Sequence, residues 1–177
     1  MSSPTTDAIS SSLQALSLPD TSRVWLYTAN RVLTDAECND VQTALTAFRG
    51  SWAAHGTPLR SDSTILLNQV VVLAVDEEPQ IATGCSIDAS VAALKSLNSA
   101  APSLSDLDLM DRSWVVFHAQ EEGTDWQRAK LHDFWAMRKS GALSDEVLIL
   151  DSTVATIGEL RASLIKNLGD SWLANMW

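Results

Sequence analysis

The feature that most constrains the fold is an apolar run, VVVLAV, which extends from Val70 to Val75. Most of its residues are valines, whose stiff β-branched side chains favour a strand, and the run is too short for an isolated helix. The acidic residues 76–78 and Pro79 end it, because proline has no N–H to donate to a neighbouring strand. The run therefore predicts a central strand, and we expect that strand to begin as early as Ile65.

A helix is expected directly after this strand, and it starts beside a cysteine. Apolar residues recur at helical spacing from Ile87 to Leu94. Ser86 is the expected N-cap, whose hydroxyl accepts from a backbone N–H of the first turn, and Asp88 adds negative charge at the positive end of the helix dipole. Cys85 would then lie at, or just before, the start of the helix.

The other segments alternate between strand and helix patterns. Thr34 and Glu37 form a capping box, and Thr156 with Glu159 repeats the pattern. The expected strands are residues 24–29, 65–75, 114–118, 126–130 and 147–150, and the expected helices are residues 34–49, 86–97, 131–140 and 156–168. Such alternation favours right-handed crossovers. The prediction is an α/β fold with a mixed, partly parallel sheet covered by helices.

Composition and length predict one domain behind a flexible arm. Residues 1–20 are rich in Ser and Thr and predict a flexible N-terminal arm, and residues 21–177 are long enough to form a single α/β domain. The two cysteines, Cys38 and Cys85, show no metal-ligand spacing, and we find no signal peptide and no bilayer-spanning run. We therefore expect a cytoplasmic protein with no metal site and no cofactor.

The charge balance limits the partners. The formal net charge is −10, from 22 acidic and 12 basic residues. Nucleic acids and anionic membranes both require basic patches, so we expect neither as a partner. An acidic surface also fits a protein adapted to high salt, and the alternative is an ordinary acidic cytosolic protein. The partner that remains is an unknown small ligand or protein.

Two residues are candidates for catalysis. A thiol at a helix start, as expected for Cys85, is stabilised as the thiolate by the dipole and the free N–H groups, and His55 in the connection at 51–63 could serve as its base. Asp88 disfavours a neighbouring anion, however, and no second cysteine is nearby. Free cysteines are most often small buried residues, and a loop histidine more often bonds a backbone carbonyl. The thiol enzyme is therefore the alternative hypothesis.

A binding pocket is the preferred interpretation of the same region. A helix start with free N–H groups suits a small anion, and the sequence contains neither G-x-x-x-x-G-K-[ST] nor G-x-G-x-x-G for a nucleotide. We predict a non-catalytic module that binds a small ligand or a protein segment. The residues expected to form its pocket are Trp52, His55, Gly56, Gly84, Cys85, Ser86 and Asp88. The tryptophans placed in connections or near the C-terminus, and so suited to a pocket or partner surface, are Trp52, Trp126, Trp172 and Trp177.

Four segments form a recognisable set: residues 22–27 (SRVWLY), 51–56 (SWAAHG), 84–90 (GCSIDAS) and 170–172 (DSW). They resemble an uncharacterised bacterial family, found mainly in the Bacteroidetes group and sometimes labelled ABC transporter ATPase. The resemblance covers nearly all of the chain after the arm, and GCSID is its most specific part. The family has no established activity and so implies no catalytic residues. The ATPase label conflicts with the sequence, which has no Walker A lysine and no phosphate-cradling glycine loop.

A fold-level analogy with thioredoxin gives the alternative fold. In that fold a strand runs into a redox cysteine at the start of a helix, and Cys85 would occupy this position. The chain has only one cysteine there, and no proline precedes the third expected strand. The thioredoxin-like α/β fold is therefore kept as the second choice.

Overall fold

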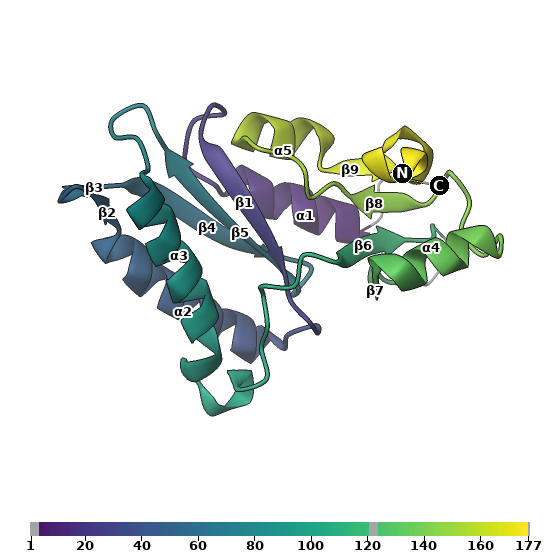
Figure 1. Ribbon diagram of the computed structural model, residues 1–177, viewed down its shortest axis with the longest axis horizontal. Coiled ribbons are helices and arrows are strands. Elements are labelled where there is room, and N and C mark those ends of the chain that lie inside the picture. Colours follow the sequence, from purple (N-terminus) through teal and green to yellow (C-terminus); the bar gives the residue numbers. More distant parts are fainter. Residues whose placement is uncertain (1–3, 121–123, 177) are drawn as a thin grey trace.

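The computed structural model describes residues 4–120 and 124–176. Residues 121–123, between the strands expected at 114–118 and 126–130, and the terminal Trp177 lie outside the described residues. Two larger sheets lie beside each other, with helices packed around them (Figure 1). The first sheet has the strand order β1-β5-β4, and the second has the order β7-β6-β8-β9. The strands of these sheets are β1 (Arg23–Thr28), β4 (Arg60–Leu66), β5 (Val70–Asp76), β6 (Trp114–His118), β7 (Gln127–Lys130), β8 (Leu148–Leu150) and β9 (Ile165–Asn167).

The central strand is confirmed as β5. It lies between β1 and β4, and all seven of its residues are buried. Alternate side chains face opposite sides of the sheet, so Val72 and Val71 enter different core clusters. The apolar run therefore has the position that its composition predicts.

The prediction of a mixed, partly parallel sheet is wrong, because every strand pair among the described residues is antiparallel. β1 and β4 do run in the same direction, since each is antiparallel to β5. The expected strand–helix–strand crossover thus exists, but β5 fills the gap between its two strands. The thioredoxin-like alternative fails with it, because that fold has parallel neighbours in its sheet.

The hairpin that inserts β5 was missed because residues 65–75 look like one strand. The chain reverses at Leu67 and Asn68, which both have positive φ (54° and 53°). Two consecutive residues in this conformation form the tight turn that matches the twist of antiparallel strands. Such turns usually contain glycine, so the sequence L-N gave no clear signal.

The helices cover both faces of the first sheet. The α-helices are α1 (Pro4–Gln14), α2 (Asp35–Ser51), α3 (Gly84–Ser96), α4 (Leu131–Lys139) and α5 (Ile157–Ser163). Apolar residues of α2 and α3 pack on one face, and those of α1 and α5 pack on the other. α4 covers the second sheet, where Phe134 meets Phe117 with ring centroids 5.1 Å apart. Both expected cap threonines are confirmed, at Thr34 and Thr156.

Smaller elements complete the chain. A short hairpin consists of β2 (Ala53–Ala54) and β3 (Thr57–Pro58). Short 3-10 helices lie at Leu97–Ser99, Pro102–Leu104, Leu168–Asp170 and Trp172–Asn175. The last expected helix is shorter than predicted, because α5 ends at Ser163 and β9 follows where we expected helix to 168. The return of β7 against β6 is confirmed as antiparallel.

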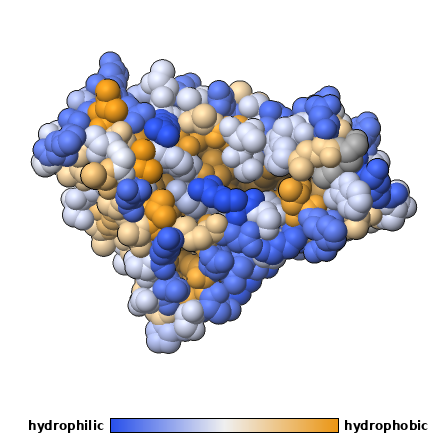
Figure 2. Space-filling model, in the orientation of Figure 1, coloured by the Kyte–Doolittle hydropathy of each residue, from blue (hydrophilic) through white to orange (hydrophobic). Residues whose placement is uncertain are grey.

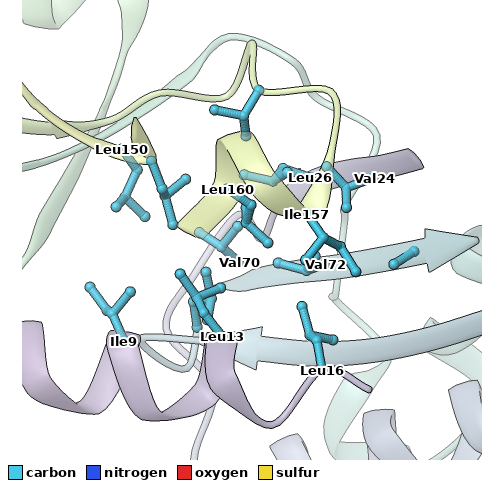
Figure 3. Close-up of a cluster of buried hydrophobic side chains, with 14 of the residues drawn as sticks. Ile9, Leu13, Leu16, Val24, Leu26, Val70, Val72, Leu150, Ile157 and Leu160 are labelled. Atoms are coloured by element: carbon cyan, nitrogen blue, oxygen red, sulfur yellow. The ribbon is translucent and has the colours of Figure 1, made fainter. Parts of the chain in front are cut away.

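Residues 4–20 do not form the flexible arm that we expected. Residues 4–14 form α1, and Ile9, Leu13 and Leu16 bury their side chains against the first sheet (Figure 3). Arg161 of α5 donates to the carbonyls of Leu13 and Leu16, so the end of α1 is also held by hydrogen bonds. The i, i+4, i+7 spacing of the three apolar residues is a helical stripe, which the high serine content obscured.

One core cluster joins the two sheets. It contains Val24 and Val72 of the first sheet together with Val116 and Leu150 of the second. Figure 3 shows Leu150, Val70 and Leu160 converging above α1. The two sheets are therefore packed against each other, and the boundary between them is a place where a groove can form.

Within the described part of the chain, no helix combines the length and the apolar character that crossing a bilayer requires.

Candidate functional site

The start of α3 differs in detail from the prediction. Thr83, not Ser86, is the N-cap: the Thr83 hydroxyl accepts from the Ser86 N–H at 3.4 Å, and the Ser86 hydroxyl accepts from the Thr83 N–H at 2.8 Å. This reciprocal pair is a capping box with serine in the place of the usual acid. Cys85 is therefore the second residue of the helix, and Ser86 is buried in its first turn.

The connection at 51–63 does meet the start of α3, as the pocket prediction requires. Trp52 Nε1 donates to the carbonyl of Ser86 at 2.7 Å. The indole is buried and packs against Phe48 and Trp25, at centroid distances of 5.3 and 6.4 Å. This contact is a packed interior contact, so neither Trp52 nor Ser86 offers a surface to a ligand.

The remaining predicted site residues lie on the surface. His55 and Gly56 (φ 50° and 79°) form the tight turn of the β2–β3 hairpin, which lies beside the start of α3 (Figure 1). His55, Gly56, Gly84, Cys85 and Asp88 are all exposed. No hydrogen bond joins His55 to Cys85 among the described residues. Nearby, Ile81 is 67% exposed, and Figure 2 shows an apolar area over the loop between β5 and α3.

The second cysteine has a different environment. Cys38 lies in the first turn of α2 and is half-buried. Desolvation raises the pKa of the Cys38 thiol to about 11, and the carboxylates of Asp35 and Glu37 add to the shift. Cys38 is therefore a packing residue with little thiolate at neutral pH.

A groove that sequence reasoning missed lies where α1, the β4–β5 turn and the second sheet meet. We call it the seam groove, and it has a volume of about 410 Å³. Its main lining residues are Ile9, Val32, Ile65, Leu67, Gln69 and Trp126. Val32 lines the groove and is 51% exposed, so it forms part of the rim.

The β4–β5 turn places Leu67 in the seam groove at a cost. A left-handed conformation costs a residue with a side chain about 1–2 kcal/mol, and Leu67 adopts it at φ 54°. The turn is held by its neighbours: Leu33 N–H donates to the Asn68 carbonyl at 2.7 Å, and Asn68 Nδ2 donates to Asp35 Oδ1 at 2.8 Å. These contacts stabilise a conformation that leucine alone would avoid.

Trp126 forms a rigid wall of the seam groove. It is only 7% exposed, and its ring centroid is 5.7 Å from that of His118. The Gln120 N–H donates to His118 Nδ1 at 2.8 Å, and His118 Nε2 lies 2.9 Å from the Thr124 carbonyl. Because a carbonyl can only accept, His118 must donate from Nε2, which fixes the tautomer and the ring orientation. His118 thus positions Trp126 and is not free for other chemistry.

Arg128 of β7 lies behind the seam groove and connects the two sheets. Its Nη1 donates to Gln69 Oε1 at 3.3 Å, and its Nη2 donates to the Asn30 carbonyl at 3.1 Å. Burial holds the pKa of Arg128 below its usual value, and the nearby Arg31 lowers it further. Arg31 itself is paired with both Glu37 and Asp106, each at 2.8 Å.

The tryptophans that we expected at a pocket or partner surface are divided between core and surface. Trp52 and Trp126 are buried, whereas Trp172 is 41% exposed. A shallower apolar surface lies around His132 and Trp135, whose rings are stacked 6.2 Å apart. Among the described residues, no group of three His, Cys, Asp or Glu side chains is placed to hold a metal ion.

The chain was also compared with known proteins. No protein-family model, curated protein or solved structure matched it. The resemblance to the bacterial family therefore stays a prediction, and any functional conclusion depends on the geometry of the chain itself.

Proposed function

We propose that the protein is a non-catalytic binding module whose seam groove takes a small, largely apolar ligand. The observation that carries this proposal is the groove, a hollow of about 410 Å³ lined by Ile65, Leu67 and Trp126. Small-molecule sites typically have volumes of about 300–1,000 Å³ and combine apolar walls with a few polar groups. The size and lining of the seam groove both fall within that description.

The strained turn supports the same proposal. Leu67 has an unfavourable positive φ, and the hydrogen bonds made by the adjacent Asn68 hold the turn in this conformation. Such residues cluster at ligand sites, where the surrounding structure keeps them in a geometry that function requires. Asn or Gly at this position would remove the strain but would also remove the apolar wall.

The net charge and the free cysteines support proposals for the kind of partner and for the cellular compartment. The net charge of −10 disfavours nucleic acid and anionic membranes as partners. Both Cys38 and Cys85 are free, which fits a reducing compartment such as the cytoplasm. We therefore propose a cytoplasmic module with a small-molecule ligand.

An NMR titration with a neutral apolar probe tests the proposal. We expect 4-phenylbutan-1-ol to shift the amide signals of Leu67 and Gln69 saturably. Val32→Glu should weaken this binding by about tenfold, because it places a charge on the apolar rim. Val32 is half-exposed, so the substitution should leave the fold intact.

Ile81→Glu is the matched control. It makes the same kind of change at an exposed apolar residue beside the start of α3, away from the residues that line the seam groove. We expect it to leave the affinity for the alcohol unchanged. Binding that is lost in Ile81→Glu and kept in Val32→Glu would contradict the seam groove and would favour the surface around Gly84 and Cys85.

A further inference from the structure

Arg128 has no carboxylate partner among the described residues, although the chain contains 22 acidic residues. Within the described part of the chain, six of the eight arginines form an ion pair with Asp or Glu. The other exception, Arg112, is exposed and lies with its guanidinium carbon 4.5 Å from the centroid of the Tyr27 ring. Arg128 is the partly buried exception, and its Nε is buried without a hydrogen-bond acceptor.

Burial makes the missing counter-charge costly. A cation that loses water contacts is destabilised unless an anion or several hydrogen-bond acceptors replace them. Among the described residues Arg128 has two neutral acceptors, the Gln69 amide and the Asn30 carbonyl, and its guanidinium carbon lies 5.6 Å from the centroid of the Trp114 ring. None of these groups carries a negative charge. A carboxylate brought by a ligand would supply the counter-charge that the described residues do not.

Gln69 connects Arg128 with the seam groove. Gln69 is one of the residues that line the groove, and its Oε1 accepts from Arg128 Nη1 at 3.3 Å. That distance is long for a hydrogen bond. A carboxylate that replaces the Gln69 oxygen would make a shorter, charge-assisted bond to the guanidinium.

We infer that the ligand of the seam groove carries a carboxylate and that Arg128 is its counter-ion, an inference that rests on the proposed binding function. The ligand class is a monocarboxylic acid with an alkyl or aryl body. The body lies against Leu67 and Trp126, and the carboxylate lies at the Gln69 end. Asp125 also lines the groove, but it is exposed, so water and salt screen its charge.

Three probes with one apolar body test the inference on the full chain: 4-phenylbutyrate, 4-phenylbutan-1-ol and 4-phenylbutylamine. Their dissociation constants are measured by NMR titration at one salt concentration. We expect the acid to bind about tenfold more tightly than the alcohol, as for one charge-assisted contact. Arg128→Met should abolish this preference. Arg112→Met removes the same charge elsewhere and should retain it.

Gln69→Glu keeps the inference testable even if Arg128→Met does not fold. It changes the size of the side chain little and supplies a carboxylate to Arg128 from within the chain. We expect this variant to have a higher melting temperature than the wild type and to lose the preference for the acid. Retained preference for the acid in Gln69→Glu would overturn the inference.

The outcomes separate the two proposals. Equal binding of acid and alcohol would overturn the role of Arg128 and leave the binding function in place. Tightest binding of the amine would also overturn it, because Asp125 would then set the sign of the ligand. An equal loss of preference in Arg112→Met would assign the effect to net charge. If none of the three probes binds, the proposed function fails together with the inference.

Discussion

The structure predicts that the two cysteine thiols differ in reactivity. With a pKa of about 11, Cys38 has about one thiolate in a thousand at pH 8. Cys85 is exposed in the first turn of α3. We therefore expect iodoacetamide at pH 8 to modify Cys38→Ser at least about tenfold faster than Cys85→Ser, measured by intact mass. Equal rates in the native variants would contradict the assignment of Cys38 as a packed thiol.

The same assay tests the thiol-enzyme alternative, which stays a prediction. No hydrogen bond among the described residues joins Cys85 to His55, so His55→Ala should leave the alkylation rate of Cys85 unchanged. A clear decrease in that rate would indicate that the imidazole activates the thiol. Thr57→Ala, on the exposed strand next to the same turn, is the matched control.

Glu37 makes the stability depend on pH in a defined window. Hydrogen bonds from Arg31 and from the Thr34 N–H hold the pKa of Glu37 at about 2, below its ordinary value of 4.5. Its contribution to stability is therefore complete above pH 4.5 and is lost as the pH falls toward 2. We expect Glu37→Gln to be less stable than the wild type at pH 7, with the difference shrinking across that window.

Urea unfolding at several pH values measures this difference. Asp40→Asn, on the exposed side of the same helix, should show no comparable trend. A Glu37→Gln difference that stays constant from pH 7 to pH 2 would show that the carboxylate does not titrate at the low value.

Local sequence patterns predicted those helices and strands whose structure depends mainly on their own residues. The valine run predicted β5, and the capping pairs at Thr34 and Thr156 predicted where α2 and α5 begin. Sheet direction was mispredicted because it depends on which strands become neighbours. The tight turn at Leu67 and Asn68 decides this, and its residues have no strong turn preference of their own.

α1 provides a quantitative test at this scale. Leu13 is 5% exposed and packs in the cluster that joins the two sheets. Leu13→Ala should therefore lower the free energy of unfolding by about 3 kcal/mol, within the range for buried leucines. Gln14→Ala, one residue further along and exposed, should change it by less than about 0.5 kcal/mol. Equal small effects of both substitutions would mean that α1 does not dock.

The candidate site also depends on contacts between distant segments, which local sequence patterns do not predict. The sequence correctly suggested that the connection at 51–63 meets the start of α3, and Trp52 makes that contact with Ser86. It gave no indication of the seam groove, which combines residues of α1, the β4–β5 turn and the segment before β7. Segments so distant in sequence are brought together by the packing of the two sheets, which no local pattern encodes.

The acidic charge of the whole molecule has its own consequence. At net charge −10, repulsion between carboxylates opposes the compact state, and salt screens that repulsion. We expect the melting temperature at pH 7 to rise between about 0.05 and 1 M NaCl. The rise should be much smaller at pH 4.5, near the isoelectric point. A melting temperature that falls with salt at pH 7 would show that the ion pairs outweigh the repulsion.

The central claim is that the seam groove is the binding site, and intermolecular NOEs test it most directly. A sample of the full chain with 4-phenylbutyrate should show NOEs from the phenyl protons of the probe to the methyl groups of Leu67 and Ile65 and to the Trp126 ring. These side chains line the groove. NOEs to Ile81 and to residues at the start of α3, with none to Leu67 or Trp126, would contradict the account.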